Sequence, residues 1–246
     1  FFENTKKFYK IIKKLNFDLS KAKVLLIRNE PPFNQQYTNS TFILEHIARK
    51  VKIINHPKSI REVPEKLFSI RLIKYMPSTL ISENIEEIKK FFSKHKKVIV
   101  KPINGYSGNE VILLTSFNSK IINKYLNKHH HVVFQKFLPQ ISKGDKRVFI
   151  INGKIKGLIS RVPKKNSILS NMSKGAFAKI NKLSKREIKI SKEVAILLKK
   201  KNIYFAGIDF IQDRLIGDIN VTSPTGLATY YSLTKINLAK YFWDNI

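Results

Sequence analysis

Apolar residues follow two patterns along this chain, and the two patterns predict different secondary structure. Stretches in which apolar residues recur every three to four positions indicate helices with one buried face. Short unbroken apolar runs bounded by turn-forming residues are typical of buried strands. The helical pattern covers residues 2–15, 38–50, 58–74, 85–92, 121–126, 185–201 and 227–246. The strand pattern covers residues 24–27, 51–54, 98–102, 110–114, 132–138, 148–150, 204–211 and 218–221.

Individual residues predict where some of these elements begin or end. Ser184 and Glu187 have the spacing of a capping box, in which each side chain bonds the backbone amide of the other residue. Ser82 is the predicted N-cap of the helix over 85–92. Residues 164–179 show only weak periodicity, so we predict a mobile loop there. We expect Trp243 to anchor the last helix.

The composition allows a sizeable core but gives the chain an extreme charge. Of the 246 residues, 43% are hydrophobic, and the formal net charge is +30. This charge favours a polyanion as partner, but the lysines are spread along the chain, so we do not expect specific nucleic-acid binding. The absence of cysteine excludes disulfides and a cysteine nucleophile. No apolar run is long enough to span a bilayer, and the start at Phe1 leaves open that the chain is part of a longer protein.

Oxygen-bearing side chains gather near the end of the chain, in a pattern that suits a divalent cation. Asp209 closes an apolar run, and Asp218 lies inside the next one. Because side chains alternate along a strand, Asp218 and Asn220 are expected on one face. Carboxylate and amide oxygens are ligands that Mg²⁺ accepts when it also holds phosphates. The alternative is that both aspartates face solvent near turns.

A second candidate site is an anion-binding strand end. Lys101 ends the strand over 98–102, and a loop of small residues follows at 104–109. The loop amides and the ammonium both favour an anion such as a phosphate. No Gly-Lys-Ser/Thr sequence opens a helix here, so this is not a P-loop. A plain hairpin is the alternative.

Two further strand ends carry candidate binding groups. Arg28 precedes a double proline at the end of the first strand, where its planar guanidinium could bind a carboxylate. The strand over 132–138 could flank a flat apolar ligand such as adenine. A surface arginine and an ordinary core strand are the respective alternatives. We interpret the three histidines at 129–131 as a solvated turn, because consecutive side chains alternate in direction and cannot converge on a metal.

Several of these pieces together resemble the bacterial glutathione synthetases, which belong to the ATP-grasp ligases. The Arg-x-Glu-Pro-Pro-Phe stretch from Arg28 and the Ile-Asn-Val-Thr-Ser-Pro stretch from Ile219 are the specific parts of the match. The match runs in order over nearly the whole chain, through residues 26–34, 55–61, 65–68, 100–102, 138–139, 144–147, 161–163, 207–209 and 218–224.

The resemblance implies an α/β protein of the ATP-grasp fold. It implies an N-terminal parallel-sheet substrate domain with a central helical region over 1–97, whose truncation is left open, and an ATP-grasp domain with antiparallel sheet over 98–246. The implied reaction is ATP-dependent ligation of γ-glutamylcysteine and glycine through an acyl phosphate, in the cytoplasm and without a membrane. The implied cofactor is Mg²⁺, with Mn²⁺ as an alternative, and a homo-oligomer stays open.

The resemblance also implies a role for individual residues. Lys101 binds ATP phosphates, Arg161 stabilises the transferred phosphoryl group, and Asp145 contacts the nucleotide. The adenine site is lined by Gln135, Lys136, Phe137 and Leu138. Arg28 belongs to the dipeptide site together with Asn220, Thr222 and Ser223. The metal is held by Asp209, Asp218 and Asn220.

The sequence departs from the family pattern at several places. The glycine-rich lid of the family is the segment 164–178 here, where most glycines are gone and Leu169 replaces an arginine. The family has glutamate where this chain has Asp218, and there is a one-residue insertion around Ile216. The family's Arg and Glu after Gly226 are missing. These changes motivate two alternatives, a ligase with another acceptor and an impaired remnant that binds anions or nucleic acid.

Overall fold

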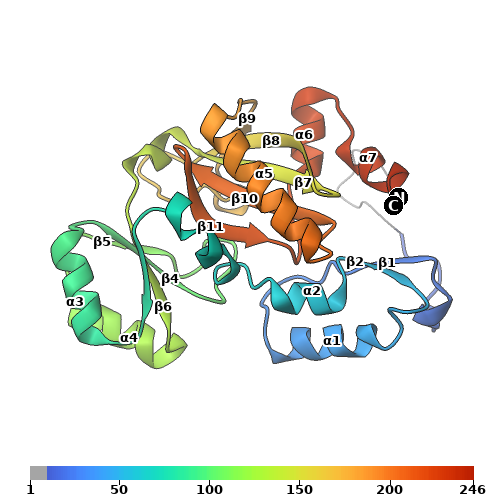
Figure 1. Ribbon diagram of the computed structural model, residues 1–246, viewed down its shortest axis with the longest axis horizontal. Coiled ribbons are helices and arrows are strands. Elements are labelled where there is room, and N and C mark those ends of the chain that lie inside the picture. The colour runs from blue at the N-terminus through green and yellow to red at the C-terminus, as the bar shows by residue number, and fades with distance from the viewer. Residues whose placement is uncertain (1–9) are drawn as a thin grey trace.

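The computed structural model describes residues 10–246 and contains three sheets. The smallest sheet pairs β1 (Val24–Leu26) and β2 (Lys52–Ile54) in parallel. Its crossover contains α1 (Gln35–Glu45), and α2 (Pro57–Glu62) follows β2; these two helices lie together below the sheet in Figure 1. Ile27, Tyr37 and Ile60 bury the space between them. A 3-10 turn, Leu19–Lys21, precedes β1.

The second sheet is antiparallel, with strand order β3-β6-β4-β5. Its strands are β3 (Thr79–Ser82), β6 (Val132–Lys136), β4 (Val98–Pro102) and β5 (Ile112–Leu114). Helices α3 (Ile85–Lys94) and α4 (Ser119–His129) pack on it through a core that includes Ile88, Phe92, Ile122 and Phe134. The helices cover one face (Figure 1), so the other face is available to line a site.

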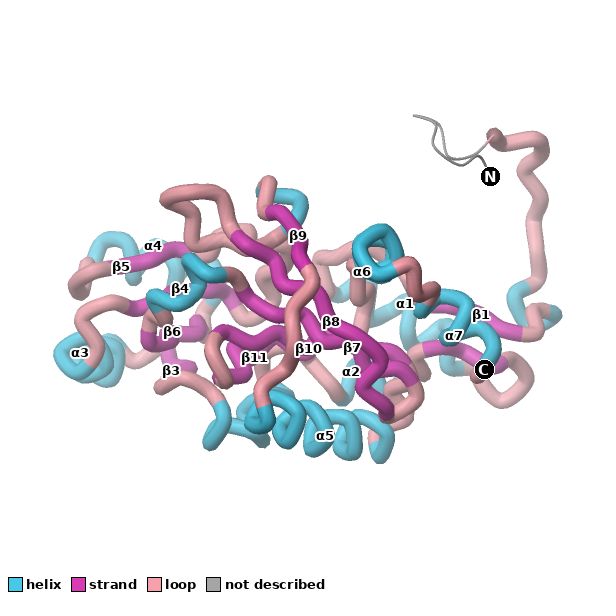
Figure 2. The backbone as a smooth tube through the Cα atoms, turned by 90° about the horizontal axis from the view of Figure 1, so that it is seen from above, coloured by secondary structure: helices cyan, strands magenta, loops and turns pink. Residues whose placement is uncertain are grey.

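The third sheet is also antiparallel, with strand order β11-β10-β7-β8-β9. Its strands are β7 (Asp145–Ile151), β8 (Lys154–Val162), β9 (Phe177–Lys179), β10 (Phe205–Ile211) and β11 (Arg214–Asn220). Helix α5 (Lys185–Lys200) lies on one side of this sheet, and α6 (Leu227–Thr234) lies on the other (Figure 2). Helix α7 (Leu238–Asp244) ends the chain. Further 3-10 segments are Phe68–Tyr75, Pro139–Lys143 and Met172–Lys174.

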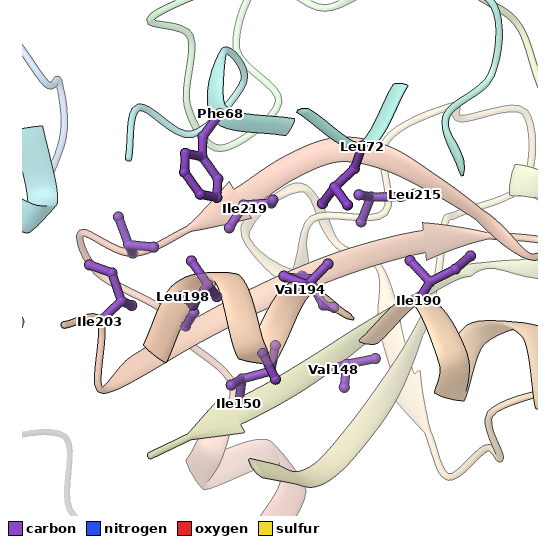
Figure 3. Close-up of a cluster of buried hydrophobic side chains, with 14 of the residues drawn as sticks. Phe68, Leu72, Val148, Ile150, Ile190, Val194, Leu198, Ile203, Leu215 and Ile219 are labelled. Atoms are coloured by element: carbon purple, nitrogen blue, oxygen red, sulfur yellow. The ribbon is translucent and has the colours of Figure 1, made fainter. Parts of the chain in front are cut away.

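Side chains of the central strand β7 point alternately to the two faces of the third sheet, and each face has its own core. Val148 and Ile150 meet Ile190 and Val194 of α5, and the 3-10 segment Phe68–Tyr75 closes the same core over β11 (Figure 3). Phe149 and Ile151 point the other way and pack on α6 and α7. Neighbouring residues of a strand face opposite sides, so one strand stabilises both layers.

The structure confirms most of the elements predicted from periodicity, and it confirms the capping box. The Ser184 hydroxyl accepts from the Glu187 amide at 3.1 Å, and the Glu187 carboxylate accepts from the Ser184 amide at 2.8 Å. None of the helices described within residues 10–246 is long and apolar enough to cross a membrane.

Four local predictions were wrong. Residues 10–15 form no helix, and the rest of the predicted helix over 2–15 lies outside the described residues. Ser82 ends β3, and the N-cap is Asn84, whose side chain accepts from two amides of the first turn. The anchor of α7 is Phe242, which is buried, whereas Trp243 is 53% exposed. The segment 164–179 contains a 3-10 turn and strand β9, which pairs with β8.

Candidate active site

A cavity of about 410 Å³ is lined from both antiparallel sheets. The 3-10 segment Phe68–Tyr75 and β3 connect the small parallel sheet to this region, and β4, β6, β7, β8, β10 and β11 each supply lining residues. The cavity collects most of the residues that the sequence predicted for the site: Lys101, Gln135, Lys136, Phe137, Leu138, Asp145, Arg161, Asp209, Asp218, Asn220 and Ser223.

At one end of the cavity, two buried lysines face one carboxylate. Asp218 Oδ1 lies 3.6 Å from Lys101 Nζ and 3.8 Å from Lys66 Nζ. Lys101 donates to the backbone carbonyl of Ile216 at 2.9 Å, and Lys66 donates to that of Gly105 at 2.6 Å. Burial lowers the pKa of Lys101, and the neighbouring Asp218 opposes that shift. Two clustered cations of this kind favour an anion in the cavity.

The strand pair β10–β11 is irregular at this point. Ile208 pairs with Ile219, but Phe210 pairs with Leu215, so the chain bulges between them. Gly217 has a φ of +87°, which a glycine adopts without steric cost. The bulge lies where the family resemblance implies a one-residue insertion, and it presents the Ile216 carbonyl to Lys101. A bulge beside a site re-aims side chains, here those of Asp209 and Asp218.

At the centre of the cavity, two arginines and two aspartates form a buried ion cluster. Arg147 donates to Asp209 through Nε at 2.8 Å and Nη2 at 2.7 Å. Arg161 donates to Asp209 at 2.9 Å and, through Nε, to Asp145 at 2.8 Å. The Ser170 hydroxyl, from the segment predicted as a mobile loop, donates to Asp145 at 2.6 Å. Burial alone would raise the pKa of Asp209, but the two guanidiniums outweigh burial and lower the pKa to about 2.

The wall on the β6 side is mainly apolar. Phe137 and Leu138 line the cavity beyond the end of β6. The Gln135 amide is buried and donates to the Thr79 hydroxyl at 2.8 Å. Apolar lining residues next to a buried amide suit a flat ring with polar groups at its edge.

The four residues predicted for dipeptide binding do not all reach the same cavity. Asn220 accepts from the Ser223 amide at 3.2 Å, and both residues line the main cavity. Arg28 donates through Nη1 to the Pro224 carbonyl at 2.9 Å and, with Thr222, lines a separate cavity of about 390 Å³. The guanidinium of Arg28 therefore bonds a backbone carbonyl here and not a carboxylate.

The residues present are compatible with a divalent cation. No cluster of three or more His, Cys, Asp or Glu side chains occurs among residues 10–246. Mg²⁺ needs only one or two protein carboxylates when phosphates complete its ligands. Asp218 Oδ1 is buried and has no hydrogen-bond partner among the described residues, which is costly unless a ligand completes it. Asp209 and Asn220 line the same cavity, although Asp209 is bound to both arginines.

The sequence reasoning did not assign roles to three residues of this site. Lys66 and Arg147 lie in stretches that carry the family resemblance, but no strand end or periodicity distinguishes them from the chain's many other basic residues. Ser170 lies in a segment without periodicity. Lys66 is only 7% exposed and lies between α2 and the 3-10 segment Phe68–Tyr75, where the sequence predicted one helix over 58–74, so its burial was not expected.

Comparison with known proteins identifies the family. The family model for the ATP-grasp domain of prokaryotic glutathione synthetase matches residues 65–235, and the model for the N-terminal domain matches residues 1–61. The chain belongs to the prokaryotic glutathione synthetase family. It is therefore an ATP-dependent ligase of the α/β class, as the resemblance implied.

Curated relatives agree with this membership. The chain is 37% identical over 227 residues to a glutathione synthetase of Bradyrhizobium diazoefficiens, covering 91% of this chain and 72% of that protein. It is 34% identical over 250 residues to a glutathione synthetase of Buchnera aphidicola subsp. Acyrthosiphon pisum, covering 99% of this chain and 78% of that protein.

Solved structures show the same fold at low identity. D-cycloserine synthetase DcsG superposes with a TM-score of 0.68 at 11% identity, covering 86% of this chain and 80% of that one. Macrocyclase MdnC of Microcystis aeruginosa, bound with a precursor peptide, superposes with a TM-score of 0.64 at 14% identity. This match covers 96% of this chain and 84% of that one. The domain boundary after residue 97 and the individual site roles stay predictions.

Proposed function

We propose that this ligase joins γ-glutamylcysteine to glycine through an acyl phosphate and releases glutathione, ADP and phosphate. The observation that supports it best is the buried Oδ1 of Asp218, which is ion-paired with Lys101 and Lys66 but accepts no hydrogen bond from the described residues. A carboxylate and two ammonium groups at one end of a cavity form a site for a metal-bound polyphosphate. The relatives are named glutathione synthetases, which supplies the product, and the two substrates are those that the family resemblance implies.

In this proposal, the protein acts mainly by positioning and by charge. Lys101 and Lys66 bind the phosphates, and Phe137 and Leu138 hold the adenine ring. Asp218, Asp209 and Asn220 hold the divalent ion, for which we propose Mg²⁺. When bound, that ion neutralises phosphate charge during transfer.

Arg161 is the proposed stabiliser of the transferred phosphoryl group. Its guanidinium lines the cavity and is fixed by Asp145 and Asp209, so no reorganisation is needed when negative charge develops. We assign Asp145 to orienting Arg161, because both of its oxygens already accept hydrogen bonds from Arg161 or Ser170. A direct nucleotide contact by Asp145 would require one of these bonds to break.

One observation supports a second candidate, a ligase of this fold with another acceptor. Both arginines that line the cavity are paired with aspartates, and the lid residues Ile168 and Leu169 are apolar. None of the three lysines of the described segment 164–178 lines the cavity, so this segment offers no cation to the glycine carboxylate. We retain the cytoplasm as the proposed location and propose no membrane contact.

The test is ADP release in reactions that omit one component at a time. With ATP, Mg²⁺, γ-glutamylcysteine and glycine, ADP should accumulate only when all four are present. Lys101→Met should lose this release, whereas Lys97→Met, which removes an exposed lysine just before β4, should keep it. ADP release that depends on the dipeptide but not on glycine would direct an acceptor screen. No dipeptide-dependent release, together with salt-sensitive DNA binding, would overturn the ligase assignment.

A further inference from the structure

A small cavity of about 40 Å³ lies beside the end of the main cavity that carries Lys66, Lys101 and Asp218, here called the phosphate end. Its wall is mainly carbon, from residues such as Phe33, Ile60, Val63 and Ile103. By the usual measure it has room for roughly three groups of the size of a water molecule. The residues that line both cavities are Pro31, Glu65, Lys66, Gly105 and Tyr106.

The small cavity is also lined by a tyrosine whose hydroxyl is not satisfied. Tyr37 lies in the first turn of α1 and is only 5% exposed. Its hydroxyl oxygen is buried and has no hydrogen-bond partner among the described residues. Because an unpaired buried hydroxyl costs free energy, a group that enters this cavity and accepts a hydrogen bond would be favoured.

The position of the small cavity restricts what can enter it. Lys66 lines both cavities, and its Nζ lies 3.8 Å from Asp218 Oδ1 at the proposed phosphate end. In an amino-acid residue whose carboxylate is phosphorylated, the side chain begins only two bonds from the reacting carbon. A pocket for that side chain must therefore adjoin the phosphate end, as this cavity does.

We propose that this cavity is the specificity pocket for the side chain of the residue whose carboxylate is activated, and that the Tyr37 hydroxyl donates to its sulfur. The inference rests on the proposed function, because it takes the cysteinyl residue of the dipeptide as that residue. A cysteinyl side chain has two non-hydrogen atoms and fits the volume, whereas a leucyl side chain has four and does not. A thiol sulfur is a weak acceptor, so size contributes more selectivity than the hydrogen bond does.

The test measures turnover and calorimetric binding of four γ-glutamyl dipeptides, which end in cysteine, α-aminobutyrate, alanine or leucine. The wild-type protein should use the leucine dipeptide at least about tenfold less efficiently than the cysteine dipeptide. Ile103→Ala, which enlarges only the small cavity, should raise the leucine-to-cysteine ratio about tenfold. The matched control Ile112→Ala removes the same atoms from β5, outside both cavities, and should leave the ratio unchanged.

Tyr37→Phe tests the hydroxyl. It should reduce the preference for cysteine over the isosteric α-aminobutyrate by roughly threefold, and leave the leucine-to-α-aminobutyrate ratio unchanged. If the hydroxyl only contacts water in the cavity, the variant becomes more stable and its side-chain preferences stay as in the wild type, which overturns the proposal.

Binding separates this inference from the proposed function. Size-selective binding of the dipeptides without glycine-dependent ADP release would support the pocket and count against the ligation of glycine. Turnover that is equal for cysteine and leucine, or equal shifts in Ile103→Ala and Ile112→Ala, would overturn the pocket while the ligation stands. Dipeptides that neither bind nor react would overturn both.

Discussion

Replacing Arg147 with methionine tests how the buried ion cluster balances its charge. In the wild-type protein the two arginines and two aspartates sum to zero. The Arg147 side chain is 10% exposed and that of Asp209 is 5% exposed, so water does little to screen the pair. Arg147→Met keeps most of the volume and leaves a buried cluster with one excess negative charge.

The free energy of unfolding at pH 7 should fall by about 3 kcal/mol, the lower part of the range for breaking a buried pair, because Arg161 still binds Asp209. The loss should depend on pH. The native pKa of Asp209 is about 2, against 3.8 for the ordinary group, so its ionisation contributes about 2 kcal/mol of stability above pH 4. That contribution is lost as the pH falls through 2. In the variant one of the two guanidiniums that outweigh burial is gone, so the pKa of Asp209 rises and this contribution shrinks.

The free energy of unfolding of both proteins can be measured in urea at pH 7, 4 and 3. Urea is uncharged, so it does not screen the ion cluster. The difference between wild type and Arg147→Met should be largest at pH 7 and should narrow towards pH 3, because Asp209 with its raised pKa takes up a proton at a higher pH in the variant than in the wild type. Arg186→Met, which removes an exposed arginine of α5, should stay within about 0.5 kcal/mol of the wild type at each pH. A large difference that does not change with pH would refute the electrostatic account and indicate a packing defect.

Three further predictions concern a helix cap, a loop contact and a lysine. Ser184→Ala should lower the free energy of unfolding by about 1 kcal/mol in urea, and an unchanged midpoint would contradict the capping role. Gly108 has a φ of +70° and an added Cβ would lie 2.6 Å from Asn171 Oδ1, so Gly108→Ala should weaken ATP binding about fivefold by separating the two loops. The control Gly153→Ala carries similar strain in a hairpin away from the cavity. An equal loss of ATP affinity in Gly108→Ala and Gly153→Ala would refute the argument that the contact between the two loops supports binding. Lys66→Met should weaken ATP binding at least tenfold, whereas Lys74→Met, an exposed lysine, should not.

The sequence predicted the strands of the site well because alternation and strand ends are local properties. Asp218 and Asn220 were expected on one face of a strand, and both line the cavity. Lys101 was expected at a strand end as an anion-binding group, and it lies 3.6 Å from Asp218. Neither statement needed knowledge of which strands pair.

What the sequence did not predict involves mainly partners that are distant in sequence, together with one helix boundary. The pairing of Arg147 with Asp209 joins β7 to β10, and no local pattern specifies that these strands are neighbours. The helix expected from the apolar residues at the start has no packing partner over residues 10–15, where Ile12 is 92% exposed, and short helices are marginal without tertiary packing. Ser82 was predicted as the cap because the end of β3 could not be located from propensity alone, and the structure has Asn84 in that role.

The central claim is that Asp218, beside Lys101 and Lys66, makes nucleotide binding depend on a divalent cation. Calorimetric titration of a non-hydrolysable ATP analogue, with Mg²⁺ and with chelator, tests this claim most directly in the wild type and in Asp218→Ala. The account predicts that Mg²⁺ strengthens binding to the wild type and has no effect on the variant, which still binds the analogue weakly through its lysines. Equal strengthening by Mg²⁺ in both proteins would contradict it.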